Sequence, residues 1–208
     1  MLLLHGIAPV DVAPPEGAAA CLGSRVAVVY SERASAPEPE RSAVLEFGRT
    51  VQELARAGPV LPVRFGTTVP DLRTLAGLVR EQETVWSARL RAVAGCSELI
   101  VHVERRTPAP VPGLRPTTGR DYLLQRVAAA RSVEALRDEV AGVLRRVARE
   151  VRTLPGRAPG RERLAVLVPH AVTTVAGTDV RRWAAARPGL EVAVTGPWPP
   201  FDFGEDVA

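Results

Sequence analysis

The sequence of 208 residues contains no lysine and no asparagine, so all 27 of its basic residues are arginine. Because arginine stays protonated in proteins, Schiff-base and general-base lysine chemistry is excluded. Aromatic residues are scarce as well, with three Trp, two Tyr and four Phe, so the core must consist mainly of Val, Leu and Ala. No apolar run approaches the roughly 20 residues that a membrane-spanning helix needs. We therefore expect a soluble protein with no membrane partner.

Cysteine is nearly absent too: Cys21 and Cys96 stand far apart and form no C-x-x-C motif. This usage fits free thiols in a reducing cytosol better than a disulfide framework. The apolar start, Met1–Ile7, lacks the basic segment and the small-residue cleavage site of a signal peptide. We expect a cytoplasmic protein whose cysteines are small buried hydrophobic residues.

Patterns that carry catalysis are also missing. The motifs G-x-S-x-G, Walker A and G-x-G-x-x-G do not occur. The three histidines, His5, His102 and His170, lie far apart, each at or beside the end of an expected strand. Acidic residues mostly accompany arginines at helical spacing, which is typical of a solvated face. We expect no catalytic residues, no metal ligands and no cofactor.

The formal net charge of +4 raises the alternative of nucleic-acid binding, since arginines on a small sheet can hold phosphates. However, 23 acidic residues are interspersed with the arginines, and the expected strands consist mainly of Val, Leu and Ala rather than of exposed aromatic residues that stack bases. The uniform use of arginine also fits the codon bias of a GC-rich genome. Nucleic-acid binding stays an alternative, and a small enzyme with a site assembled by the fold is a weaker one.

The first half of the chain alternates short Val- and Leu-rich segments with amphipathic segments. The former predict strands and the latter, with apolar residues three and four apart, predict helices. Pro62 is placed most easily at a sheet edge or a bulge. The strands are expected at Leu2–Leu4, Arg25–Ser31, Val60–Phe65 and Glu98–Glu104, and the helices at about Glu40–Ala57 and Pro70–Val93. This order predicts an α+β sheet with its helices on one face.

Thr107–Pro116 contains four prolines and a glycine, the strongest linker signal in the middle of the chain. We therefore expect two small sandwich-like α+β domains, at residues 1–106 and 117–208. The second should be rich in helix, with a small sheet. Its helices are expected at Arg120–Ala130, Ser132–Leu154 and Thr178–Arg187, and its strands at Leu164–Val168 and Leu190–Thr195.

The segment near the end of the chain concentrates the scarce aromatic residues. Trp198, Phe201 and Phe203 fall within six residues and alternate with prolines. Such a segment frays unless its rings are buried, so one interpretation is a strap that packs onto the domain. The other is an anchor for a partner, since aromatic side chains dominate binding hot spots. One segment can serve both purposes.

Several motifs together resemble the gas vesicle protein GvpF/GvpL family. They occur in the family's order and span most of the chain. They are Gly58–Thr67 (GPVLPVRFGT), Glu98 at the start of a strand, Thr118–Leu124 (TGRDYLL), Leu164–Pro169 (LAVLVP) and Thr195–Phe203 (TGPWPPFDF). The chain departs from the family pattern at Leu99, where an aromatic residue is common, and at Phe201-Asp202, where Tyr-Ser is common.

The resemblance implies an accessory protein, without catalytic activity, that is required to form gas vesicles and is associated with them. It implies two α+β domains, the first a modified ferredoxin-like fold. The implied partners are the small hydrophobic shell protein and other vesicle accessory proteins. Two questions are left open: whether the chain is of the F type or the L type, and whether it is a minor component of the vesicle wall or an assembly chaperone. We take Arg64, Phe65, Trp198, Phe201 and Phe203 as candidate partner-binding residues, with Arg64 suited to hold a carboxylate.

Overall fold

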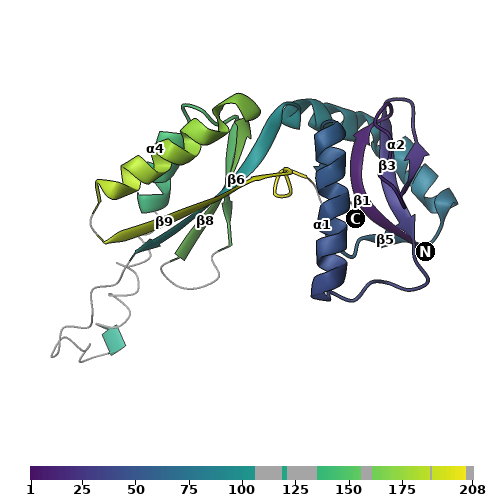
Figure 1. Cartoon of the computed structure of the whole chain (residues 1–208), viewed down its shortest axis with the longest axis horizontal. Coiled ribbons are helices and arrows are strands. Elements are labelled where there is room, and N and C mark those ends of the chain that lie inside the picture. Colours follow the sequence, from purple (N-terminus) through teal and green to yellow (C-terminus); the bar gives the residue numbers. More distant parts are fainter. Residues whose placement is uncertain (106–118, 121–134, 156–160, 188, 205–208) are drawn as a thin grey trace. The chain divides into compact units, whose positions relative to one another are not determined.

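The computed structural model describes residues 1–105, 119–120, 135–155, 161–187 and 189–204 (Figure 1). The chain divides into two compact units, Met1–Ser97 with the tail that begins at Trp198, and Glu98–Pro197. The expected domains were 1–106 and 117–208. The structure instead groups Glu98–Arg105 with the second unit and the tail with the first, because strand pairing and ring burial join segments distant in sequence. The expected linker, 107–116, lies outside the described residues.

The first unit contains a five-stranded antiparallel sheet and two helices. The strand order is β2-β3-β1-β4, and β5 pairs with β1 as well. The elements are β1 (Leu2–Pro9), β2 (Ala19–Leu22), β3 (Val26–Glu32), α1 (Arg41–Ala57), β4 (Leu61–Pro62), β5 (Thr68–Val69) and α2 (Leu72–Val93). β2 lies within Pro9–Gly23, a segment between the first two predicted strands that is rich in Pro, Ala and Gly and therefore predicts a loop.

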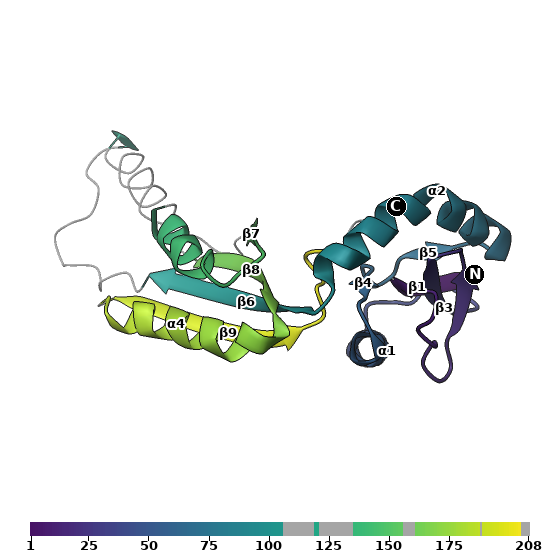
Figure 2. The same cartoon turned by 90° about the horizontal axis from the view of Figure 1, so that it is seen from above.

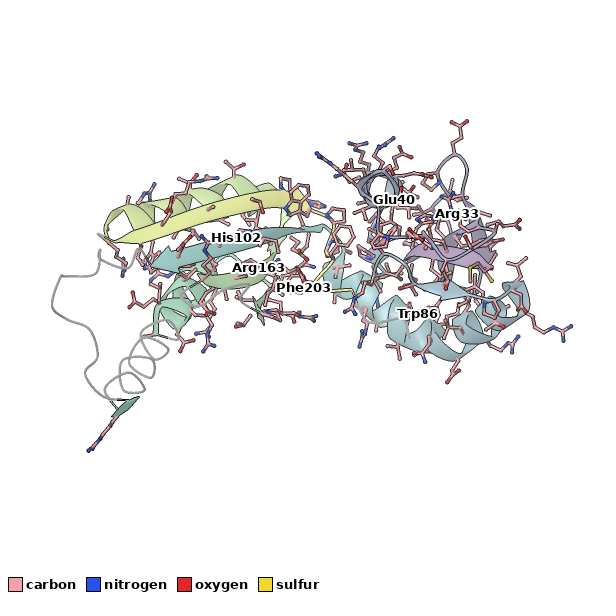
Figure 3. All side chains as sticks on the ribbon, turned by 90° about the horizontal axis from the view of Figure 1, so that it is seen from below. Arg33, Glu40, Trp86, His102, Arg163 and Phe203 are labelled. Atoms are coloured by element: carbon pink, nitrogen blue, oxygen red, sulfur yellow. The ribbon has the colours of Figure 1, made fainter. Side chains whose placement is uncertain are left out.

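The two helices of this unit cover opposite faces of the sheet. Figures 2 and 3 show α1 on one side of β1 and β3 and α2 on the other. The side chains of Val29 and Ala20 face Leu54 of α1, and nearly every residue of β1 and β3 is buried. The prediction of helices on one face was therefore wrong, because strands without polar alternation need cover on both sides. The ferredoxin-like arrangement expected for this unit is not confirmed.

An irregular segment interrupts the strand predicted at Val60–Phe65. β4 and β5 both pair with β1, and the chain between them leaves the sheet at Val63–Thr67. The Val63 amide donates to the His5 carbonyl at 3.2 Å, and the Leu4 amide donates to the Thr67 carbonyl at 2.9 Å. The register of β1 shifts between Leu4 and Gly6 at the same point, so His5 lies at a bulge. Pro62 occupies an edge strand, as predicted.

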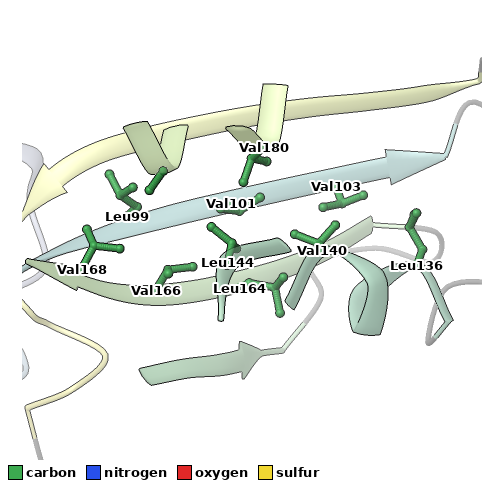
Figure 4. Close-up of a cluster of buried hydrophobic side chains, with 11 residues drawn as sticks. Leu99, Val101, Val103, Leu136, Val140, Leu144, Leu164, Val166, Val168 and Val180 are labelled. Atoms are coloured by element: carbon green, nitrogen blue, oxygen red, sulfur yellow. The ribbon is translucent and has the colours of Figure 1, made fainter. Parts of the chain in front are cut away.

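The second unit contains a four-stranded sheet in the order β7-β8-β6-β9. Alternate residues of β6 and β8 face the same side, where they pack against helix 135–144 and α4. Figure 4 shows this cluster, with β6 running opposite to β8 and β9. The elements are β6 (Cys96–Arg105), β7 (Glu150–Leu154), β8 (Arg161–Pro169), the single turn η1 (His170–Val172), α4 (Thr173–Ala185) and β9 (Leu190–Trp198).

The long helix predicted at Ser132–Leu154 was only partly right. The described helical residues end at 144, and Glu150–Leu154 form β7, which pairs antiparallel with β8. Val151 and Thr153 alternate with polar residues along this strand, and Val151 packs against the unit's core. The helix predicted at Arg120–Ala130 lies almost wholly outside the described residues. The α+β class itself is confirmed by two sheets with helices packed on them.

Candidate functional site

The aromatic tail is anchored to the first unit by a compact turn. After Trp198 ends β9, the amide of Phe201 donates to the Pro199 carbonyl at 2.7 Å and the amide of Gly204 donates to the Pro200 carbonyl at 2.8 Å. Both prolines are buried, and Phe203, labelled in Figure 3, is only 4% exposed. The interpretation of the tail as a packed strap is therefore confirmed for Phe203 and the two prolines.

The same turn holds two other aromatic side chains at the surface. Trp198 and Phe201 are each 40% exposed, although each borders a buried proline. The three aromatic residues predicted as one group therefore divide into an inward ring, which fixes the tail, and an outward pair, which is accessible. A pair of exposed rings on a hydrogen-bonded turn loses little conformational freedom when it binds a partner.

The tail lies beside β4, which leads to the other two candidate residues. Gly204 lies so close to Pro62 that a β-carbon added to the glycine would collide with the carbonyl oxygen of Pro62. Arg64 and Phe65 follow two and three residues after Pro62. The structure thus brings all five sequence-predicted residues into one unit, although the tail follows the whole second unit in the sequence.

Arg64 and Phe65 occupy the irregular segment that bridges β4 and β5. The Arg64 carbonyl accepts hydrogen bonds from the amide and the hydroxyl of Thr67, at 3.1 and 2.7 Å, which closes a tight turn. Gly66 adopts a φ of +88° within this turn, a conformation that glycine enters without strain. Arg64 is exposed, and the Phe65 ring is half-buried. The role of the Arg64 guanidinium in holding a carboxylate stays a prediction.

Phe65 forms one wall of a cavity of about 230 Å³ in the first unit. Its ring meets Phe47 edge to face, with centroids 5.4 Å apart, and Phe47 lies 5.2 Å from the imidazole of His5. Arg33 and Glu46 also line the cavity and are joined by an ion pair of 2.8 Å. The remaining lining residues are small or apolar: Leu3, Ala34, Ser35, Pro37 and Ala43.

The imidazole of His5 is almost completely buried, with 3% of the residue exposed. Its Nε2 is 3.0 Å from the Ser31 hydroxyl oxygen, whereas Nδ1 has no hydrogen-bond partner among the described residues. Burial, with a smaller effect of the Arg33 charge, lowers the pKa of His5 from 6.5 to about 4. The ring is therefore neutral near pH 7 and serves as an aromatic wall of the cavity.

Sequence reasoning did not identify His5, Phe47, Arg33 and Glu46 as neighbours. The sequence indicated only that His5 lies at or beside the end of an expected strand and that Phe47 lies within the helix expected at about Glu40–Ala57. The carboxylate of Glu46 has a lowered pKa because Arg33 donates a hydrogen bond to it. The only signal available in the sequence was that a polar residue interrupts the apolar run Leu2–Ile7, which is unusual for a strand buried on both faces.

The comparisons with known proteins decide the family. A family model described as gas vesicle synthesis protein GvpL/GvpF matches residues 8–205. The chain belongs to this family. A search of curated proteins found no match.

Two solved structures of gas vesicle protein GvpF share the fold of this GvpL/GvpF chain. The protein from Anabaena sp. PCC7120 has a TM-score of 0.81 at 17% identity, covering 98% of this chain and 95% of the other. The protein from Microcystis aeruginosa has a TM-score of 0.77 at 15% identity and covers 98% of both chains. The GvpL/GvpF fold is therefore retained while most side chains differ.

Among the described residues, no helix is long and apolar enough to cross a membrane. In the same part of the chain, no group of three or more His, Cys, Asp or Glu residues is arranged to hold a metal ion.

Proposed function

We propose that this GvpL/GvpF chain is a non-enzymatic accessory protein of gas vesicle formation that binds the hydrophobic shell subunit during assembly. Its location would be the cytoplasm, in association with the forming vesicle. Family membership supports the connection with gas vesicles. The outward pair Trp198 and Phe201 supports the binding role. A hydrophobic shell subunit exposes apolar surface before it joins the vesicle shell, and apolar rings on a binding partner can cover that surface.

The observation that carries this proposal is that the tail buries one aromatic side chain and exposes two others. Phe203 and the two buried prolines fix the turn, so Trp198 and Phe201 are held at the surface. Aromatic rings that were exposed only because the end of the chain frayed would not lie on a turn that buried residues fix in place. Large aromatic side chains on a rigid support are typical of binding hot spots, where few residues provide most of the affinity.

The test is capture of the purified shell subunit by the full chain and by variants. We expect the double variant Trp198→Ala/Phe201→Ala to fold normally and to bind the subunit roughly tenfold more weakly or worse. The matched control is Leu22→Ala/Val85→Ala, which removes two apolar side chains that are 64% and 43% exposed elsewhere in the unit. Undiminished binding by the tail variant would contradict the proposed anchor.

Truncation at Gly196 and a salt titration complete the test. Truncation removes Phe203 as well, so its effect on binding is interpretable only beside the double variant that retains Phe203. If the chain were instead a nucleic-acid-binding protein, its retention on heparin would fall steeply with salt. Flat retention across salt is the expected result.

A further inference from the structure

The cavity beside His5 has the dimensions and the polarity of a site for one aromatic ring. A cavity of about 150 Å³ is enough to hold benzene, and this one measures about 230 Å³, which leaves room for a substituent or a second fused ring. Three of its walls are the rings of His5, Phe47 and Phe65. Aromatic rings prefer edge-to-face and offset contacts with one another, so another flat ring suits these walls.

The polar side of the cavity favours a ring that carries a hydrogen-bond donor. Glu46 uses its Oε1 atom to accept from Nη2 of Arg33 at 2.8 Å. An ionised carboxylate offers two oxygens, so the other oxygen is available to a phenol hydroxyl or an indole N–H. Arg33 and Glu46 hold each other in place, with side chains 39% and 60% exposed. They therefore form a polar rim at the edge of an otherwise apolar pocket.

A second hollow indicates that the ring belongs to a polypeptide. An open depression of about 900 Å³ shares Arg33 and Ala34 with the ring pocket. It contains the exposed apolar side chains of Met1 and Leu72, 42% and 48% exposed, beside charged residues of both signs. A free small aromatic molecule would fill the pocket alone. A chain anchored by its ring would continue along the depression and cover these apolar side chains.

We propose that the His5–Phe47–Phe65 cavity binds a tyrosine or tryptophan side chain of a partner polypeptide, whose flanking residues lie along the depression at Met1 and Leu72. The pocket is built from residues other than the outward pair of the tail. The proposal rests on the proposed function only in that the chain binds a partner protein. That partner does not have to be the shell subunit.

The test measures binding to the purified full chain by NMR, with ¹⁵N-labelled histidine as the reporter. The probes are p-cresol, its methyl ether, and a capped pentapeptide, acetyl-Ala-Ala-Tyr-Ala-Ala-amide. We expect p-cresol to shift the His5 ring signals, the methyl ether to bind several-fold more weakly, and the peptide to bind roughly tenfold more tightly than p-cresol. The His102 and His170 signals should stay unchanged.

Two variants and one control locate the site. Phe65→Ala removes a half-buried wall, and Glu46→Gln keeps the shape while removing the carboxylate; each should weaken peptide binding at least several-fold. Phe201→Ala, which changes an exposed ring of the tail, should bind the peptide as the unchanged chain does. Variants that shift thermal unfolding are compared at a temperature where their spectra match that of the folded chain.

Three outcomes would overturn the proposal. Absence of any His5 shift at millimolar p-cresol removes the ring site. Equal binding of p-cresol and its methyl ether removes the role of Glu46, and equal binding of p-cresol and the peptide removes the polypeptide occupant. Because no shell subunit is present, these results are independent of the capture experiment that tests the proposed function.

Discussion

At the scale of single residues, His5 is a buried base whose neutral form is favoured by folding. Its pKa of about 4 in the folded chain lies below the value of 6.5 for an exposed imidazole. The unfolded chain therefore binds a proton at His5 as the pH falls through 6.5, and the folded chain does so only near pH 4. Stability associated with His5 is consequently present above pH 6.5 and is lost progressively between pH 6.5 and 4.

This linkage predicts a specific difference between the chain and the variant His5→Gln, which retains a group able to hydrogen-bond with Ser31. Between pH 7 and pH 5 the free energy of unfolding should fall by about 2 kcal/mol more in the unchanged chain than in the variant. Urea unfolding at the two pH values measures it. The same substitution at His170, an exposed position in the second unit, is the control. If the free energies of unfolding of the chain and of His5→Gln changed in parallel with pH, this would contradict the burial of His5 in its neutral form.

The candidate residues show how far sequence reasoning reaches at this scale. The cluster Trp198, Phe201 and Phe203 was recognisable because aromatic residues are otherwise scarce. Which ring faces inward was not, since this depends on the turn at Pro199–Gly204 and on the space beside Pro62. The cavity at His5 was beyond prediction because β1, the segment that follows β3, α1 and the Arg64–Thr67 turn each contribute to it, and no local pattern records that convergence.

At the scale of elements, the two long helices of the first unit were predicted to within two residues. Their apolar residues recur at spacings of three and four, and Gly58-Pro59 marks the end of α1. Phe47, Val51 and Leu54 are buried as the pattern indicates, whereas Val44 on the same predicted face is 42% exposed. Periodicity alone therefore overestimated the buried stripe of α1 at its first turn.

The strands β2 and β7 were missed for opposite reasons. Ala19–Leu22 contains little β-branched side chain and lies in a segment rich in proline and glycine, so it indicated a loop. Glu150–Leu154 follows a helix, and Val147 and Val151 continue the helical spacing, so it indicated more helix. In both cases the decisive contribution is pairing with a neighbouring strand, β3 or β8, which a local pattern cannot reveal.

Two glycines of the first unit provide a matched test of element geometry. Gly48 lies inside α1 with nothing within 4 Å of the position where a β-carbon would be added. Gly48→Ala should therefore stabilise the protein by roughly 0.5–1 kcal/mol, since alanine restricts the unfolded chain and favours helix. Gly66→Ala also meets open space, but its φ of +88° is unfavourable for alanine. We expect Gly66→Ala to destabilise by about 1 kcal/mol or more.

Thermal and urea unfolding of both variants measure these effects. Stabilisation by Gly66→Ala would show that the Arg64–Thr67 turn does not require the left-handed conformation. Destabilisation by Gly48→Ala would show that α1 is not regular at its centre.

At the scale of the whole molecule, the path of the chain joins its two ends in one unit. The first unit is completed by the tail from Trp198, which the chain reaches only after building the second unit. Phe203 is 4% exposed there, and burial of a phenylalanine side chain contributes roughly 1.5–3 kcal/mol. A segment at the end of the chain thus stabilises elements near its beginning, and the stability of the first unit depends on the full sequence.

This arrangement predicts that deleting residues 198–208 weakens the first unit and spares the second. Amide hydrogen exchange reports on both in one experiment, because buried strands of each unit exchange slowly. Exchange of Val28 and Val29 in β3 should accelerate by an amount that corresponds to about 2 kcal/mol. Val101 and Val166, in the core of the second unit, should keep their rates.

The variant Phe203→Ala separates ring burial from the rest of the tail, and it should reproduce most of the effect of the deletion. Phe201→Ala, which removes a ring that is 40% exposed, should leave exchange in β3 nearly unchanged. Equal acceleration in both units after the deletion would mean that the tail stabilises the molecule as one cooperative body. Acceleration in β3 alone follows if the chain end closes the first unit, and it would explain why a tail able to present two rings to a partner also carries a third ring that it buries.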